Sequence, residues 1–251
     1  MKIGAQLYTA RDFTQTGKDF AETIKKVAAI GYETVQVSGI SQDISAQEVA
    51  DVCKANNIEI AITHTPPDRM RSDIQTVIKN HEIMGCKYIG IGGVPGYPHT
   101  KEGFADFIKE FAPIAKAIKD AGKQFMYHNH AYEFFKCDGK TGLDYLVDNF
   151  ADAGFTLDTY WIQAGGGDPA WWIKKLAGRV DCIHLKDFVI VDGQARMAEV
   201  LEGNLNWDAI FDAAKAAGVK YALVEQDDAY VGDPFDCLNT SFKNLKKRGL
   251  A

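Results

Sequence analysis

The sequence predicts an α/β protein, a single (β/α)8 barrel that spans residues 1–251 as one domain. Strand-like runs alternate eight times with amphipathic helical patterns, and the connections between them are short. Eight such units in about 250 residues fit the size of this barrel. No GxGxxG motif follows the first strand, which removes the commonest reason to expect an open doubly wound sheet instead.

The expected strands share a nearly continuous apolar character, which is typical of strands covered on both faces. Each run is short and rich in β-branched or aromatic residues, as strands usually are. In chain order they occupy residues 2–8, 32–37, 58–63, 86–93, 123–130, 154–158, 179–187 and 219–226.

The expected helices carry apolar residues at helical spacing and mostly end near Gly or Asn, residues that tolerate the left-handed conformation after a helix. One helical stretch precedes each strand from the second onward, and a last helix closes the chain. These stretches occupy residues 20–31, 46–57, 73–85, 104–122, 142–153, 169–178, 207–218 and 233–249.

Composition and charge narrow the class of protein. The chain is 46% hydrophobic with a net charge of −6, and this acidic balance argues against a nucleic-acid partner. The sequence contains no long apolar run and no signal-peptide pattern, so we expect a cytoplasmic protein without a membrane partner. Its five widely spaced cysteines form no CxxC, which argues against disulfides and zinc-thiolate sites. The sequence does not determine the oligomeric state, and a homo-oligomer is possible.

Polar and ionisable residues gather at the expected carboxyl ends of the strands, where barrels of this type place their active sites. Strands one and three contribute Gln6, Tyr8 and His64. The later strands contribute His128, Asn129, His130, Glu133, Asp158, His184, Lys186 and Glu225.

Each of these residues has a plainer explanation when taken alone. Asp158 could cap the next helical turn, His184 could be a hydrogen-bonded core histidine, and Glu225 could pair with a lysine. Together, however, they would converge unpaired at one mouth, which is energetically costly. A divalent cation would remove that cost. Carboxylates with one imidazole suit Mn²⁺, Mg²⁺, Co²⁺ or Zn²⁺.

Two further histidines are not expected to join this set. His81 falls in the middle of a helical pattern, and we expect it at the surface. His99 lies in a loop, "GYPHT", and would reach the mouth only if that loop folded over it.

The chain resembles the xylose isomerase-like TIM barrels, the sugar phosphate isomerase/epimerase superfamily, over essentially its whole length. The resemblance rests on five stretches, of which the third is the most specific: "IGAQLYTARD", "YHNHAYEF", "LDTYWIQAGGGDPAWWIKKLAGRVDCIHLKD", "GNLNWDAIF" and "VEQDD".

The resemblance implies a metal site built from strands five to eight, with Asp158, His184 and Glu225 as ligands. The family's strand-five glutamate has no direct counterpart, because His128 stands in its place. Two alternatives follow. Either Glu133 turns back to bind one divalent ion, or His128 is the ligand and Glu133 lies behind it. The first is preferred, because a carboxylate keeps the charge balance that a hard ion favours.

The chemistry implied is metal-dependent isomerisation or epimerisation of a sugar or sugar phosphate by enolisation. Glu133, Glu225, His128 and His130 are the expected proton-transfer groups. Lys186 either polarises the carbonyl or forms a salt bridge with Asp187 or Asp158.

Gln6, Tyr8, His64 and Trp161 are the expected contacts of a sugar or polyol substrate. An unphosphorylated substrate is favoured, since Arg11 is the sole arginine near a strand end. The alternatives are a lyase or dehydratase of the inosose dehydratase or 3-keto-glycoside type, and a noncatalytic sugar-binding barrel.

Overall fold

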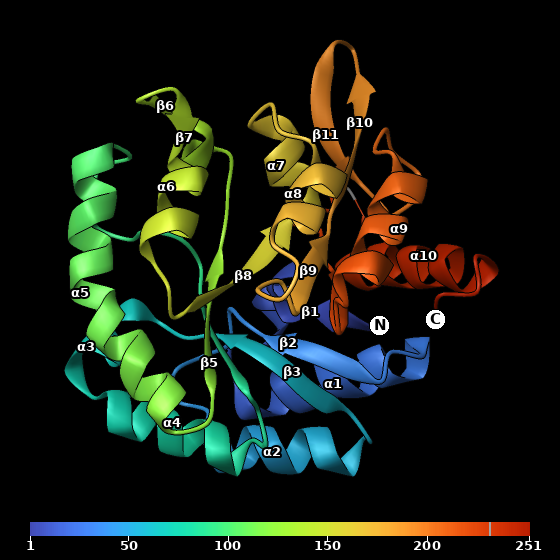
Figure 1. Cartoon of the computed structure of the whole chain (residues 1–251). Helices are drawn as coiled ribbons and strands as arrows, with labels where there is room; N and C mark the ends of the chain where they lie inside the picture. The colour runs from blue at the N-terminus through green and yellow to red at the C-terminus, as the bar shows by residue number, and fades with distance from the viewer. Residues whose placement is uncertain (231) are drawn as a thin grey trace.

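The computed structural model describes residues 1–230 and 232–251 and contains a closed barrel of eight parallel strands (Figure 1). The hydrogen-bonded order around the barrel is β1-β12-β9-β8-β5-β4-β3-β2. The predicted (β/α)8 fold is therefore confirmed. The barrel strands are β1 (Lys2–Gln6), β2 (Thr34–Val37), β3 (Glu59–His64), β4 (Tyr88–Ile91), β5 (Gln124–His128), β8 (Ala153–Asp158), β9 (Cys182–Leu185) and β12 (Tyr221–Val224).

The helices surround the barrel, and their first turns are set by capping side chains. Thr16, Ser45, Thr100 and Thr141 each accept a hydrogen bond from a backbone N–H of the helix that follows. The α-helices are α1 (Gly17–Ile30), α2 (Ala46–Ala55), α3 (Pro67–Ser72), α4 (Ile74–Ile83), α5 (Lys101–Asp120), α6 (Gly142–Asn149), α7 (Thr159–Ala164), α8 (Pro169–Lys175), α9 (Trp207–Ala217) and α10 (Pro234–Lys247). Two 3₁₀ segments, η1 (Leu7–Phe13) and η2 (Tyr132–Phe134), follow β1 and β5.

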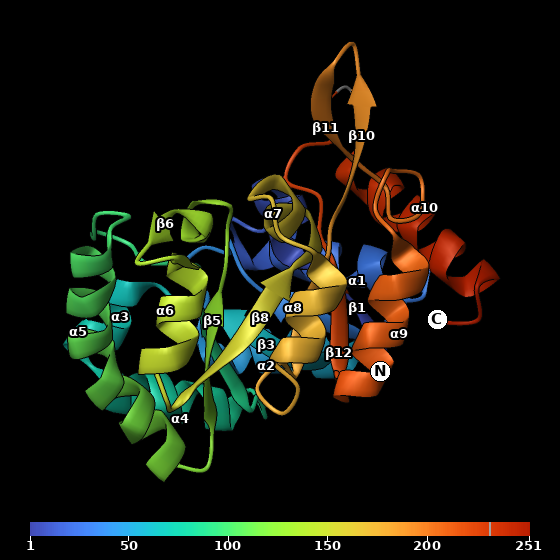
Figure 2. The ribbon, with the colours of Figure 1, turned by 45° about the horizontal axis from the view of Figure 1, so that its top comes forward.

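Two hairpins lie outside the barrel and were not predicted. They are β6–β7 (Lys136–Cys137 with Lys140–Thr141) and β10–β11 (Asp187–Val191 with Gln194–Ala198). Each turns at an Asp-Gly pair with positive φ, 50° and 78° in the first and 51° and 76° in the second. Asp-Gly is a strong hairpin signal. The β10–β11 hairpin projects away from the barrel (Figure 2).

The base of the β10–β11 hairpin is fastened by one buried carboxylate, that of Asp187. It therefore joins the start of the hairpin to the chain that returns from it. The donors to this carboxylate are the backbone N–H groups of Phe188, Leu201, Gly203 and Leu205 and the indole of Trp207.

The expectation that His81 lies at the surface is wrong. His81 is only 2% exposed and lies on the inner face of α4. Its Nε2 lies 2.8 Å from Oγ1 of Thr63, and its Nδ1 lies 2.8 Å from the carbonyl oxygen of Val77. Burial lowers the pKa of His81 to about 4, so the ring is neutral at pH 7.

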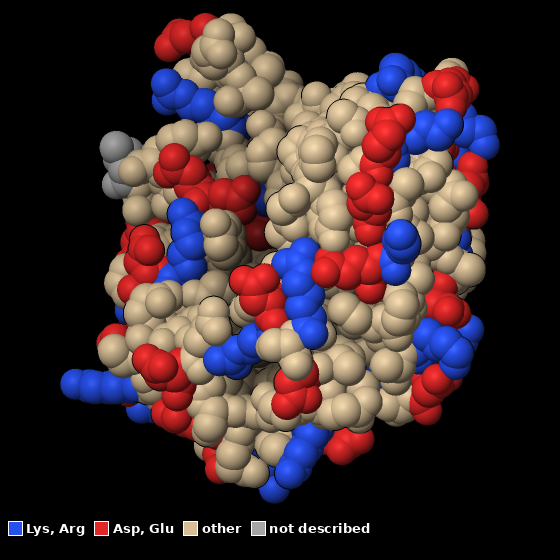
Figure 3. Space-filling view, turned by 90° about the vertical axis from the view of Figure 1, so that its left-hand side faces the viewer, with Lys and Arg blue, Asp and Glu red and all other residues tan. Residues whose placement is uncertain are grey.

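The surface charges are mixed on the face that Figure 3 presents, where Lys and Arg alternate with Asp and Glu. The basic residues form no continuous stripe on this face. Among the described residues, no helix combines the length and the apolar character that crossing a membrane requires.

Candidate active site

Four buried side chains from neighbouring strands converge at the carboxyl end of the barrel. His128 ends β5, Asp158 ends β8, His184 lies on β9, and Glu225 directly follows β12. One ligand atom from each lies within 4.8 Å of the others. The strand register brings them together, because Asp158 pairs with His184 and the Glu225 N–H donates to the carbonyl of Leu185.

Asp158 performs two tasks with its two oxygens. Its Oδ1 accepts a hydrogen bond of 2.9 Å from the Trp161 N–H and so caps α7. Its Oδ2 is buried, faces Lys186 and His184, and belongs to the cluster. Asn129 fixes the backbone here, because its Oδ1 accepts from the Asp158 N–H at 3.0 Å. The capping role expected of Asp158 and its place in the cluster therefore coexist.

The His184 ring is oriented by an amide behind it. Its Nε2 lies 2.7 Å from Oε1 of Gln36, an atom that can only accept, so Nε2 carries a proton and Nδ1 faces the cluster. The Nδ1 lies 2.7 Å from Oε2 of Glu225. Burial opposes a charge on this ring, but the carboxylates of Glu225 and Asp158 raise the pKa of His184 to about 9.

Lys186 supplies a cation to the same group of acids. Its Nζ lies 3.2 Å from Asp158 Oδ2, 3.1 Å from Glu225 Oε2 and 3.0 Å from Asp227 Oδ2. Burial works against the charge, yet these carboxylates raise the pKa of Lys186 above its usual value. The expected salt bridge to Asp158 is present, whereas Asp187 is engaged at the base of the hairpin.

Glu133 does not join the cluster. The 3₁₀ turn η2 directs its carboxylate backward, where Oε1 accepts from the Tyr127 hydroxyl at 2.6 Å and Oε2 from the His130 N–H at 2.8 Å. Its side chain is fully buried, and this burial raises the pKa of Glu133 to about 8. This placement revises the preferred expectation, because His128 occupies the strand-five position of the cluster.

A pocket of about 410 Å³ opens above the cluster, and we call it the mouth pocket. It gathers seven of the expected residues, including Lys186 and Glu225 from the cluster region. It is lined by Tyr8, Arg11, Ser38, His64, Gly92, His128, His130, Trp161, Lys186, Glu225 and Asp227.

Several aromatic side chains shape one wall of the mouth pocket. The rings of His130 and Trp161 lie 5.5 Å apart, and Lys186 Nζ lies 5.4 Å from the Trp161 ring centroid. Tyr132 stacks against His130, and His99 stacks on Tyr132 with ring centroids 3.7 Å apart. The loop that carries His99 thus reaches the aromatic group behind the mouth without lining the pocket.

Some residues fall outside the expected roles. Gln6 does not line the mouth pocket; it is fully buried, and its Oε1 accepts from the Tyr8 N–H at 3.1 Å. Gln36 and Asp227 were missed by the sequence reasoning. An amide in the apolar run "TVQV" and a second acid in "VEQDD" were the available signals.

The donor set fits a hard or borderline divalent cation. Asp158 Oδ2, His184 Nδ1 and Glu225 Oε2 are buried and lie 2.7 to 3.7 Å from one another or from Lys186 Nζ, whereas His128 Nδ1 has no hydrogen-bond partner among the described residues. Buried polar groups are normally fully paired, so two buried acids beside an imidazole without a partner need an explanation. Two imidazoles and two carboxylates at this spacing provide one, because these are common metal ligands.

A match to a protein-family model shows which family the chain belongs to. The model of the xylose isomerase-like TIM barrel matches residues 24–246. The chain belongs to this family. The resemblance seen in the sequence is thereby confirmed. No curated protein sequence matches the chain.

Solved structures share the xylose isomerase-like barrel at low identity. A sugar phosphate isomerase/epimerase from Parabacteroides distasonis is 21% identical with a TM-score of 0.80, covering 98% of this chain and 93% of that one. An L-ribulose 3-epimerase is 15% identical with a TM-score of 0.74, covering 100% and 95%. A probable 3-DHS dehydratase from Bacillus anthracis is 14% identical with a TM-score of 0.73, covering 99% and 100%. At these identities the likeness establishes the fold alone.

Proposed function

We propose that this protein is a divalent-metal-dependent isomerase or epimerase that enolises a keto-sugar or related polyol. The observation that carries the proposal is the convergence of four buried ligand groups, two imidazoles and two carboxylates, beneath the mouth pocket. In this proposal His128, Asp158, His184 and Glu225 hold one ion of Mn²⁺, Mg²⁺, Co²⁺ or Zn²⁺. Glu133 is a positioning residue, because it holds the backbone N–H of His130.

The chain's own residues would move the proton and fix the substrate. A bound divalent cation would act as a Lewis acid toward a carbonyl and its neighbouring hydroxyl. His130 offers an unpaired Nδ1 beside the mouth, which makes this ring the candidate to accept the proton. Glu225 is the second proton-transfer group, and Lys186 donates to a substrate oxygen.

The mouth pocket supplies binding groups for a sugar. Trp161 offers a ring to the apolar face of the sugar, and Tyr8 and His64 also line the pocket. Arg11 is the sole arginine in the lining, and its Nη1 already donates to the carbonyls of Tyr8 and Asp227. An unphosphorylated substrate therefore remains the favoured one.

Deuterium exchange tests the proposal. The protein is incubated in D₂O with a panel of ketoses and each of the four metals, and the carbon-bound hydrogens are followed by NMR. We expect exchange next to the carbonyl with one sugar class and its loss in Asp158→Ala. No exchange with any sugar and metal would contradict enolisation.

One observation favours a lyase or dehydratase as the second candidate. Because Glu133 is turned away, Glu225 has no partner carboxylate from strand five on the opposite side of the mouth. An elimination needs one base and a leaving group but no matched pair of carboxylates. Loss of water or of an aglycone in the same NMR experiment selects this reaction. Binding without either change would select a noncatalytic sugar-binding barrel.

A further inference from the structure

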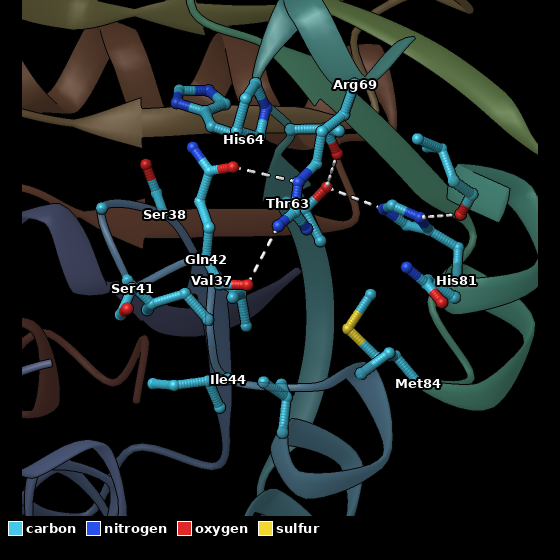
Figure 4. Close-up of a pocket in the computed structure, with 18 residues that line it drawn as sticks. Val37, Ser38, Ser41, Gln42, Ile44, Thr63, His64, Arg69, His81 and Met84 are labelled. Carbon is cyan, nitrogen blue, oxygen red and sulfur yellow. Dashed lines mark hydrogen bonds between the residues drawn. The ribbon is translucent and has the colours of Figure 1, made fainter. Parts of the chain in front are cut away.

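A second cavity of about 330 Å³ lies beside the mouth pocket, between the β2–α2 loop, the end of β3 and α4. We call it the α2/α4 cavity. Figure 4 shows Val37, Ile44 and Met84 on its walls, with Ser38 and His64 among the residues that line it. Ser38 and His64 also line the mouth pocket, so the two spaces share a wall at the rim of the barrel.

The lining of the α2/α4 cavity is mixed, with aliphatic side chains beside hydroxyl, amide, guanidinium and imidazole groups. Ile44, Val49 and Val77 are buried side chains that line it, and none of the described lining residues is acidic or has a six-membered aromatic ring. A sugar ring would find neither an aromatic platform nor a carboxylate here. This chemistry favours an apolar, uncharged group.

The polar side chains of the cavity are mostly satisfied by the protein itself. His81 is paired with Thr63 and with the Val77 carbonyl. Arg69 donates to the side-chain and backbone oxygens of Gln42 at 3.0 and 2.9 Å, which ties α3 to the β2–α2 loop (Figure 4). An occupant therefore meets few free hydrogen-bonding groups.

We propose that the α2/α4 cavity is a subsite for an apolar substituent of the sugar, so that the substrate is a keto-sugar that carries this substituent away from its carbonyl, as a glycoside with a keto group on another ring carbon does. This inference rests on the proposed function, because it places the sugar ring in the mouth pocket. At about 330 Å³ the cavity is large enough for a small group in addition to the sugar ring. A short alkyl or single-ring aglycone fits this size.

The test compares hexyl and methyl β-D-glucopyranoside as probes. Their binding is followed by NMR on protein labelled at the methionine methyl groups and the tryptophan indoles. Met84 reports on the α2/α4 cavity and Trp161 on the mouth pocket. We expect the hexyl glycoside to shift both signals and to bind at least tenfold tighter than the methyl glycoside.

A filling variant and a matched control locate the effect. Asn80 lines the cavity on α4, whereas its neighbour Lys79 is exposed and does not. Asn80→Phe should bring the hexyl glycoside within twofold of the methyl glycoside, and Lys79→Phe should preserve the difference. If Asn80→Phe lowers the melting temperature, Ala46→Leu replaces it, with the exposed Gln47→Leu as control.

The outcomes separate this inference from the proposed function. An unmoved Met84 signal, equal affinities, or an advantage retained in the filling variant would overturn the subsite. A Met84 shift without a Trp161 shift would overturn its link to the mouth pocket. Failure of deuterium exchange while both signals respond would count against enolisation and leave the subsite standing.

Discussion

The Nζ of Lys186 lies 3.1 Å from Oε2 of Glu225, the same oxygen that faces His184 in the ligand cluster. The lysine ammonium thus neutralises the carboxylates of Asp158 and Glu225, which would otherwise bind a divalent cation. Two cations this close repel each other strongly in a buried site. Lys186 and a metal ion therefore compete for the charge of Asp158 and Glu225.

Replacing this lysine should strengthen metal binding. We expect Lys186→Met to raise the affinity for Mn²⁺ by about tenfold or more, because the competing ammonium is removed from the low-dielectric cluster. Isothermal titration calorimetry measures the change. Lys175→Met is the control, since Lys175 pairs with Asp144 away from the cluster. Unchanged or weaker binding would contradict the competition.

Metal content after dialysis distinguishes the two strand-five ligand models. We expect Asp158→Ala, His184→Ala and His128→Ala to lose the ion, because each removes one converging donor. Glu133→Gln should keep it, since its oxygens are occupied by Tyr127 and His130. Elemental analysis gives the result. Retention by both Asp158→Ala and His184→Ala would exclude the cluster, and loss from Glu133→Gln alone would restore Glu133 as the ligand.

The buried His81 should make stability depend on pH. Its pKa is about 4 in the folded protein, below the usual value of about 6.5, so the unfolded chain takes up the proton first. The free energy of unfolding should therefore fall as the pH drops from about 6.5 to about 4, by up to about 3 kcal/mol from this group. Urea unfolding across this range measures the slope.

Two variants isolate the contribution of His81 to that slope. His81→Gln should make it shallower but not flat, because His64 and His130 remain, whose pKa values burial also lowers, to about 3 and about 4. His99→Gln, at an exposed loop position, should leave it as in the wild type. A wild-type slope in His81→Gln would show that another group causes the pH dependence.

The barrel wall should not accept a side chain at Gly4. A Cβ there would lie 2.6 Å from Thr34 Cγ2, 2.7 Å from Leu223 Cδ2 and 2.7 Å from the Thr34 carbonyl oxygen. We expect Gly4→Ala to lower the free energy of unfolding by about 1–3 kcal/mol. Gly17→Ala is the control, because its new Cβ would meet only the flexible end of Glu48. Equal urea midpoints would contradict the expected clash.

The barrel could be predicted from the sequence because its strands and helices leave strong, repeating patterns. The same logic placed Asp158, His184 and Glu225 at one rim, since parallel strands end on one side of a barrel. The role of Gln36 was not predicted, because a single amide in an apolar strand does not indicate that it orients the ring of His184. The hairpins were missed although Asp138-Gly139 and Asp192-Gly193 are recognisable turn signals.

The position of Glu133 could not be predicted because it depends on a local turn. It lies five positions after His128, and both a forward and a backward path of the chain were compatible with that spacing. The 3₁₀ turn η2 and the Tyr127 hydroxyl select the backward path. Such a choice depends on packing in three dimensions, which residue spacing does not encode.

The anchoring of the β10–β11 hairpin at Asp187 makes its far end a convenient site for protein engineering. The carboxylate holds both chains at the base, so changes at Asp192 and Gly193 should leave the rim of the barrel in place. A fluorophore or an immobilisation linker attached at this tip would stand outside the barrel. It would provide a handle for sensors without any alteration of the residues that line the mouth pocket.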